Sequence, residues 1–153
     1  QSRFEAASRV LMAILQAMPR NADALNLAAA TALARGQAAE AVELMERAVA
    51  LHPANPIFLA NLAEMRRRAG DKAGSLEAAR RAVSAGPNVA MAQANLGIAL
   101  YETGDLDGAE TAQNAALAID PRQPRCLNNL GSIARDRGDR NAAANLYRRA
   151  LRL

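Results

Sequence analysis

The chain has 153 residues, of which 51% are hydrophobic and only four are aromatic, and 39 of the hydrophobic residues are alanine. An interior of such small side chains favours helices that approach each other closely. The single cysteine and single histidine exclude a disulfide framework and a zinc site with four cysteine and histidine ligands. The net charge of +4 is divided between basic segments 56–89 and 124–153 and an acidic segment 90–123. We therefore expect no continuous track for nucleic-acid phosphates.

Apolar residues at helical spacing predict one leading helix over residues 3–17 and then four pairs of helices. The pairs are expected at 22–35/38–51, 56–69/72–85, 90–103/106–119 and 124–137/140–153. Only short turns separate these segments, so nearly the whole chain is helical in this prediction. The fold class is therefore all-α, with about nine helices.

Proline, glycine and alanine each recur every 34 residues along the chain. The columns are Pro19, Pro53, Pro87 and Pro121, then Gly36, Gly70, Gly104 and Gly138, and finally Ala48, Ala82, Ala116 and Ala150. Glycine after a first helix supplies the left-handed residue that ends it. The aspartates that follow three of the glycines are suited to capping the second helix, and proline cannot continue that helix. A fixed period of this length predicts an array of helix–turn–helix repeats.

The pattern resembles the tetratricopeptide repeat (TPR) family. The resemblance rests on the period and on segments such as Ala94-Asn95-Leu96-Gly97, Gly104-Asp105 and Asp120-Pro121, and it covers essentially the whole chain. It implies a right-handed superhelical solenoid whose first helices line a concave face. It also divides residues 1–153, as a single array, into a second helix with its loop (1–21), three repeats (22–55, 56–89 and 90–123) and a truncated fourth repeat (124–153).

A further column, Asn61, Asn95 and Asn129, lies on the concave face by analogy with the family. A row of side-chain amides, each with a donor and an acceptor, is able to pair with the backbone of an extended peptide of any sequence. The row is similar to the asparagine ladder in the TPR regions of O-linked N-acetylglucosamine transferases and related bacterial arrays. In the first repeat, Asn26 is one residue early and Leu27 occupies the column. The alternative role is structural, with each amide hydrogen-bonding the neighbouring repeat, and the two roles are compatible.

The same analogy places charged, polar and apolar side chains along the groove. Arg67 and Arg68 close the first helix of the second repeat, and Arg125 and Arg135 lie in the fourth, so we expect an acidic peptide segment to dock at these basic ends. The alternative for Arg67 and Arg68 is a pair of solvated cations near a helix C-terminus, where the macrodipole favours positive charge. The other groove candidates are Glu64, Met91, Ile98, Tyr101, Asn128 and Ser132. For Tyr101, packing in the core is an equally open alternative.

The resemblance implies a non-catalytic module that binds a partner protein or an extended peptide in the concave groove. Two alternatives stay open, namely a substrate-recruiting domain of a larger glycosyl- or sulfotransferase and a self-associating assembly scaffold. The sequence contains no recognisable nucleophile–base pair and no recognisable pair of catalytic carboxylates. We therefore expect no enzymatic activity within these residues, no cofactor and no metal site.

The chain does not begin with methionine and has no secretory signal pattern at its start, so we expect a piece of a longer protein. The last helix is expected to leave a stripe that contains Leu146 and Leu151 partly uncovered, which favours self-association through this end. No apolar run reaches the roughly 20 residues that a membrane-spanning helix needs, so no membrane span is expected. A lone cysteine fits a reducing compartment, and we expect a cytoplasmic rather than a periplasmic location.

Overall fold

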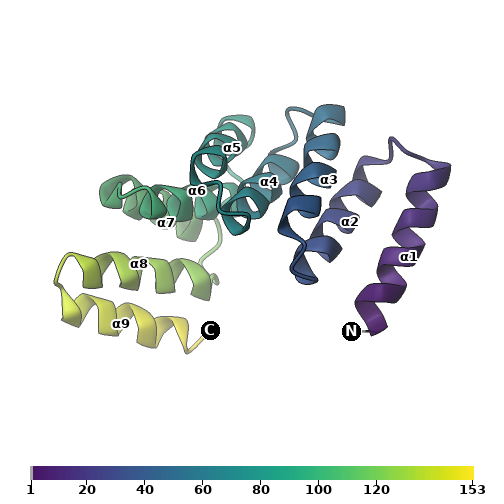
Figure 1. Ribbon diagram of the computed structural model, residues 1–153. Helices are drawn as coiled ribbons and strands as arrows, with labels where there is room; N and C mark the ends of the chain where they lie inside the picture. The colour runs from purple at the N-terminus through teal and green to yellow at the C-terminus, as the bar shows by residue number, and fades with distance from the viewer. Residues whose placement is uncertain (1) are drawn as a thin grey trace.

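The computed structural model describes residues 2–153, with side chains from Glu5 onward. Within that range the chain forms nine α-helices and no strand (Figure 1). The helices are α1 (Ser2–Ala17), α2 (Ala22–Ala34), α3 (Ala38–Leu51), α4 (Pro56–Arg68), α5 (Lys72–Ala85), α6 (Ala90–Glu102), α7 (Leu106–Ile119), α8 (Pro124–Asp136) and α9 (Arg140–Ala150). The predicted all-α class is confirmed. All the predicted boundaries agree to within one residue except the last, because α9 ends at Ala150 and a turn follows it.

The turn inside each pair has the chemistry that the sequence predicts. The glycines that end the first helices have φ between +81° and +89°, a region that a Cβ atom disfavours. The Oδ1 atom of Asp71 accepts a hydrogen bond from the backbone N–H of Gly74 at 2.8 Å, and Asp105 and Asp139 cap their helices in the same way at 2.9 Å. Gln37 stands in the same position before α3 but makes no side-chain cap.

The two helices of each pair pack closely through small residues. Three alanines of one column, Ala48, Ala82 and Ala116, have no exposed surface. In two pairs the first helix carries a glycine opposite a large side chain of the second helix. A Cβ atom at Gly97 would lie 2.5 Å from Nε2 of Gln113, and one at Gly131 would lie 2.6 Å from Cε1 of Tyr147. Glycine is therefore favoured at both positions, because a Cβ atom would force the neighbouring side chain to shift.

The pairs stack so that the first helices form one continuous face. Helix α6 packs against both α4 and α8, whereas the second helices α3, α5 and α7 each lie between two first helices. The whole chain curves into an arch with both ends on the same side (Figure 1). Helix α1 packs on α2 as the other second helices pack on the first helix that follows them. Across residues 2–153, no helix combines the length and the apolar character that crossing a membrane would require.

Candidate functional site

The asparagine column lies along the first helices, with Asn61 on α4, Asn95 on α6 and Asn129 on α8. Two of these amides donate to the preceding first helix. Nδ2 of Asn61 donates to Oδ1 of Asn26 at 2.8 Å, and Nδ2 of Asn95 donates to the backbone oxygen of Ala60 at 2.8 Å. Both bonds join residues 35 positions apart, one more than the repeat length, because successive first helices are offset by one residue where they touch. The column therefore links neighbouring repeats.

The third asparagine departs from this arrangement. Nδ2 of Asn129 is buried without a hydrogen-bond partner among the described residues. Its counterpart acceptor, the backbone oxygen of Ala94, instead accepts a hydrogen bond from Nε2 of Gln113 at 3.0 Å. Gln113 has no exposed surface and occupies the space left by Gly97. Gln113 was not among the residues that the sequence singled out, although a polar side chain in a column otherwise filled by Leu11, Met45, Ala79 and Tyr147 was a signal that could have revealed it.

The amide oxygens of the three asparagines are not used in contacts between repeats. Among the described residues, no hydrogen bond engages Oδ1 of Asn61, Asn95 or Asn129, and none of these oxygens is a buried unpaired atom. The donor of each amide is thus bonded or buried within the array. The side chains of Asn61 and Asn129 are partly exposed on the face of the first helices, whereas Asn95 is only 7% exposed, so its acceptor is the least open of the three. Three such acceptors, one on each of α4, α6 and α8, form a row that is suited to N–H donors spaced along an extended chain.

A charged cluster lies on the same face and joins three first helices. Arg67 on α4 makes a two-pronged contact with Glu64 at 2.8 and 3.0 Å and also donates to Glu102 of α6 at 3.0 Å. Arg125 reaches from α8 to within 3.6 Å of Glu64. The hydrogen bond with Glu64, together with the one to Glu102, raises the pKa of Arg67 above its ordinary value. The predicted residues Glu64, Arg67 and Arg125 are therefore brought together, and their charges are largely compensated by one another and by Glu102.

A second polar cluster joins α6 to α8. The hydroxyl of Tyr101 donates to Oδ2 of Asp136 at 2.5 Å, and Nε of Arg135 donates to Oδ1 of the same carboxylate at 3.0 Å. The hydrogen bond from the hydroxyl, aided by Arg135, lowers the pKa of Asp136, and the same bond raises the pKa of Tyr101. Tyr101 also packs beside the core residues Leu100 and Ile133, so its ring and its hydroxyl have different roles. Asp136 was not among the residues that the sequence singled out.

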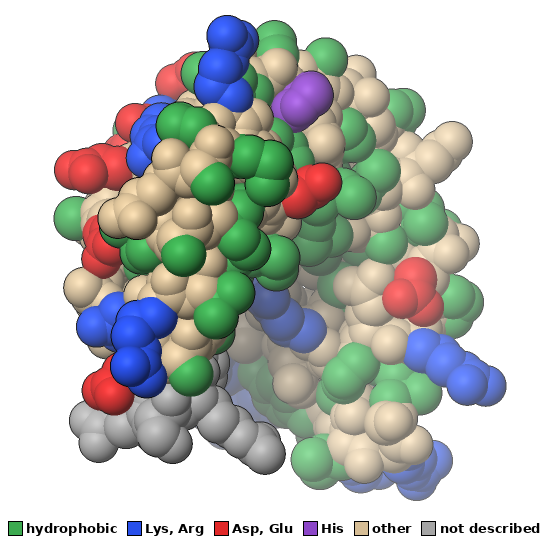
Figure 2. Space-filling view, turned by 90° about the vertical axis from the view of Figure 1, so that its right-hand side faces the viewer, with side chains coloured by type: hydrophobic (Ala, Val, Ile, Leu, Met, Phe, Trp, Pro, Cys, Tyr) green, Lys and Arg blue, Asp and Glu red, His purple; other side chains and the backbone are tan. Residues whose placement is uncertain are grey.

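The remaining predicted residues lie on the same first helices without joining either cluster. Arg68, Met91 and Asn128 are exposed, while Ile98 and Ser132 are partly buried. The hydroxyl of Ser132 donates to the backbone oxygen of Asn128 at 3.2 Å and lies 3.2 Å from the hydroxyl of Tyr147 on α9, so it serves its own helix pair. Seen from the side of α1, the molecule is hollowed below its centre, and a basic side chain lies inside the hollow (Figure 2).

The residues with reactive side chains are placed for packing. Cys126 is buried, its Sγ lies 3.3 Å from Oε1 of Gln123, and burial raises the pKa of its thiol. The ring of His52 packs edge-on against Phe58 with 6.1 Å between centroids. Over the described part of the chain, no group of three or more histidine, cysteine, aspartate or glutamate side chains is arranged to hold a metal ion. The chemistry that this face offers is hydrogen bonding and charge.

One leading helix and four stacked pairs of helices over residues 2–153, with a continuous face of first helices, define the class of helical-repeat solenoid proteins. Family models described as tetratricopeptide repeat match residues 22–65, 60–124 and 125–153, so together they span residues 22–153. The chain belongs to the tetratricopeptide repeat family. A search of curated proteins found no match.

Solved structures with this fold are numerous, and three illustrate the likeness. TTC0263, a thermophilic TPR protein of Thermus thermophilus, superposes with a TM-score of 0.84 at 24% identity, and the match covers 99% of this chain and 83% of that protein. MamA gives a TM-score of 0.80 at 24% identity, with 97% and 87% covered. YrrB, described as a TPR protein with an unusual peptide-binding site, gives 0.73 at 21% identity, with 98% and 77% covered. At these identities the likeness establishes the fold.

Proposed function

We propose that the chain is a non-catalytic protein-interaction module that holds an extended peptide against the face of α4, α6 and α8. The single observation that carries this proposal is the direction of the asparagine amides. Asn61 and Asn95 use Nδ2 to join neighbouring repeats, which leaves each Oδ1 without a hydrogen-bond partner among the described residues, partly exposed at Asn61 and more enclosed at Asn95. Backbone N–H groups of an extended peptide are donors that suit such acceptors, and pairing of this kind does not depend on the peptide's side chains.

The charged cluster argues that affinity comes from the peptide backbone more than from acidic side chains. Arg67 and Arg125 already contact Glu64, so an acidic ligand would have to displace a carboxylate that is in place. Arg68 is exposed and makes no ion pair among the described residues. On α4, Arg68 is therefore the basic side chain that is available to form an ion pair with an acidic residue of the ligand. The unusual peptide-binding site of YrrB adds support from a protein with the same fold.

The test is a capture experiment followed by a measurement on a defined peptide. The chain and an Asn61→Ala/Asn95→Ala/Asn129→Ala variant, both verified as folded by circular dichroism, are used to capture proteins from the source lysate. The matched control is Asn114→Ala/Asn141→Ala/Asn145→Ala, since these three asparagines are exposed on second helices. A peptide from the captured segment is then synthesised with and without N-methyl groups on successive backbone nitrogens, which removes the donors and keeps the side chains.

We expect the control variant to bind the peptide as the original chain does, and the asparagine-column variant to lose at least about tenfold in affinity. N-methylation is expected to weaken binding to a similar degree. A peptide that binds both variants equally, or that tolerates N-methylation, would assign the asparagines to repeat stacking alone. A substrate-recruiting role beside a transferase domain would use the same groove, and a captured substrate of such an enzyme would favour it.

Self-association is a second candidate function, and one observation favours it. Leu151 is 87% exposed, whereas Leu15 and Val49, which occupy the same column in other second helices, are only 7% exposed. Val83 and Leu117 of the same column are partly buried, so Leu151 is the most exposed side chain of this apolar column and is suited to contact with another molecule. Sedimentation of the chain and of Leu151→Asp at increasing concentration tests this role. A mass that stays monomeric for both would remove it.

A further inference from the structure

The amide of Asn129 makes no hydrogen bond among the described residues, unlike the amides of Asn61 and Asn95. Nδ2 of Asn61 and Nδ2 of Asn95 are each held by a 2.8 Å bond to the preceding first helix. Nδ2 of Asn129 is buried and unpaired, although the residue as a whole is partly exposed. A buried donor without a partner costs free energy that a bonded donor does not. Asn129 is therefore the asparagine of the column whose amide is not tied to the array.

Gln113 explains why Asn129 is untied. The backbone oxygen of Ala94 lies 35 residues before Asn129, as that of Ala60 lies 35 residues before Asn95. The oxygen of Ala94 accepts instead from Nε2 of Gln113 at 3.0 Å. Oε1 of Gln113 is itself buried and unpaired, so no bond between the two side chains replaces the one that Asn129 lacks.

The first helix of the pair makes room for Gln113. A Cβ atom at Gly97 would lie 2.5 Å from Nε2 of Gln113, so the missing side chain lets Nε2 reach Ala94 on the same helix. Gln113 has no exposed surface and does not itself meet a ligand. Met45 and Ala79, which occupy its column in the two preceding pairs, carry no amide, and the asparagine that follows is bonded in both cases.

We propose that Gln113 is a positioning residue for the peptide groove, because its bond to Ala94 leaves the Asn129 amide free to turn toward the ligand. This inference rests on the proposed function and deepens it. Turning Asn129 breaks no hydrogen bond and removes an unpaired donor from the interior, whereas Asn61 and Asn95 would each have to break a bond. The turned amide offers a donor as well as an acceptor, so it pairs with both the N–H and the C=O of one residue in an extended peptide. Asn129 thereby fixes the register of the ligand.

NMR of the free 153-residue chain tests whether the amide is untied. Side-chain Nδ2 signals are assigned by their loss in Asn95→Ala and Asn129→Ala, and proton exchange with water is measured. We expect the Asn129 protons to exchange at least about tenfold faster than those of Asn95, since only the latter donor is bonded. In Gln113→Met the oxygen of Ala94 is released, and exchange at Asn129 is expected to slow to the rate at Asn95. Equal exchange at the two asparagines of the original chain would overturn the proposal, as would unchanged exchange in Gln113→Met.

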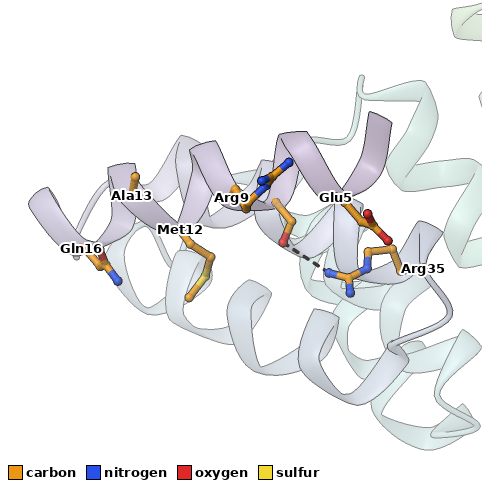
Figure 3. Close-up of a pocket in the computed structure, with 7 residues that line it drawn as sticks. Glu5, Arg9, Met12, Ala13, Gln16 and Arg35 are labelled. Carbon is orange, nitrogen blue, oxygen red and sulfur yellow. Dashed lines mark hydrogen bonds between the residues drawn. The ribbon is translucent and has the colours of Figure 1, made fainter. Parts of the chain in front are cut away.

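The variants are chosen so that the fold is kept. Gln113→Met removes the donor at similar volume, and Met45 occupies the same column. Gln113→Ala repeats the test with the residue that the preceding pair carries in this column. Gln16→Met is the matched control, because Gln16 is exposed on α1, where it lines an open cavity with Arg9 and Met12 (Figure 3). Circular dichroism verifies that all variants fold.

The peptide captured through the groove supplies the binding test, measured by fluorescence anisotropy. Asn129→Ala is expected to weaken binding by at least about tenfold, and by more than Asn61→Ala or Asn95→Ala does. Gln113→Met is expected to weaken binding to a similar degree in the original chain and to have no further effect in Asn129→Ala, whereas a merely structural role would act equally in both backgrounds. Gln16→Met is expected to change binding by less than about twofold.

Equal losses of affinity at the three asparagines, or equal effects of Gln113→Met with and without Asn129, would overturn this inference and leave the proposed function standing. Failure of the chain to capture any peptide, or unchanged binding by the triple alanine variant of the column, would overturn the proposed function and this inference with it.

Discussion

At the scale of single residues, the size of one side chain decides whether its neighbour is glycine or alanine. Gly97 faces Gln113, whereas in the preceding pair Ala63 and Ala79 occupy the same two columns. Gln113 fills the space of the missing Cβ atom and takes the acceptor that Asn129 would otherwise use. Replacing two alanines by a glycine and a glutamine within one pair therefore changes the hydrogen bonding of the next repeat.

Gly97→Ala is predicted to lower the free energy of unfolding by about 1 kcal/mol, the difference between two opposing effects. A clash in a packed contact costs about 1 to 3 kcal/mol, and the better helix propensity of alanine returns up to about 1 kcal/mol. In a Gln113→Ala background the clash is absent, so the same change is expected to be neutral or stabilising. Urea denaturation of the original chain, the two single variants and the double variant gives the coupling free energy between positions 97 and 113. Equal effects of Gly97→Ala in both backgrounds would contradict the assigned contact.

The hydrogen bond between Tyr101 and Asp136 predicts a pH effect. It raises the pKa of Tyr101 above its ordinary value of 10.0, so the folded chain holds the phenolic proton more tightly than the unfolded chain. The bond's contribution to stability is present below about pH 10 and is lost as the pH rises through the raised pKa. In a Tyr147→Phe chain, whose phenolate absorbance reports Tyr101 alone, Asp136→Asn is expected to move the titration to lower pH. An unchanged titration would mean that the contact is absent in solution.

At the scale of helices, the turn between the two helices of a pair is where sequence and structure agree best. The glycine column and the aspartate caps were both predicted, because each follows from backbone requirements within a few residues. The sequence predicts α9 as far as residue 153, whereas the helix ends at Ala150. Beyond Ala150 the backbone N–H of Arg152 donates to the oxygen of Arg149, three residues back and not four, so the α-helical pattern does not continue.

The uncapped α3 offers a prediction of increased stability. Gln37 has nearly the same backbone angles as the capping aspartates but no cap bond, and Glu40 lies three residues later, where it completes a capping box with a suitable first residue. Gln37→Asp is expected to raise the free energy of unfolding by about 1 kcal/mol, with Gln37→Ala as a near-neutral control. Thermal and urea denaturation measure the difference. A stabilisation equal to that of the alanine control would contradict capping.

At the scale of the whole molecule, contacts between repeats decide which predicted site residues meet. The sequence placed the asparagines and arginines on one face, but it did not reveal that Nδ2 of Asn95 bonds Ala60 or that Arg67 bonds Glu102. These pairs are 35 residues apart, and the offset of one residue from the repeat period depends on how the stacked helices rotate. The sequence period shows which residues are equivalent in successive repeats. The angle at which the repeats stack determines which of these residues touch.

The charged cluster predicts how stability depends on Arg67. Arg67→Met leaves Glu64 and Glu102 facing each other without the shared cation, and we expect a loss of about 1 to 3 kcal/mol in the free energy of unfolding. Arg68→Met is the matched control, since Arg68 is exposed, and is expected to change stability by less than about 0.5 kcal/mol. The difference should shrink in about 1 M salt. Equal effects of the two changes in urea denaturation would contradict a role for the cluster.

The contact between Arg125 and Glu64 has a consequence for the order of folding. Most hydrogen bonds described above join a helix to its partner or to the next repeat, and such short-range contacts allow folding to begin in any pair and spread outward. Arg125 and Glu64 instead lie on α8 and α4, with α6 between them. This ion pair forms only after three consecutive first helices have stacked. A pair of fluorescent probes placed beside these two residues would therefore time the stacking of α4, α6 and α8, separately from the formation of the individual helices.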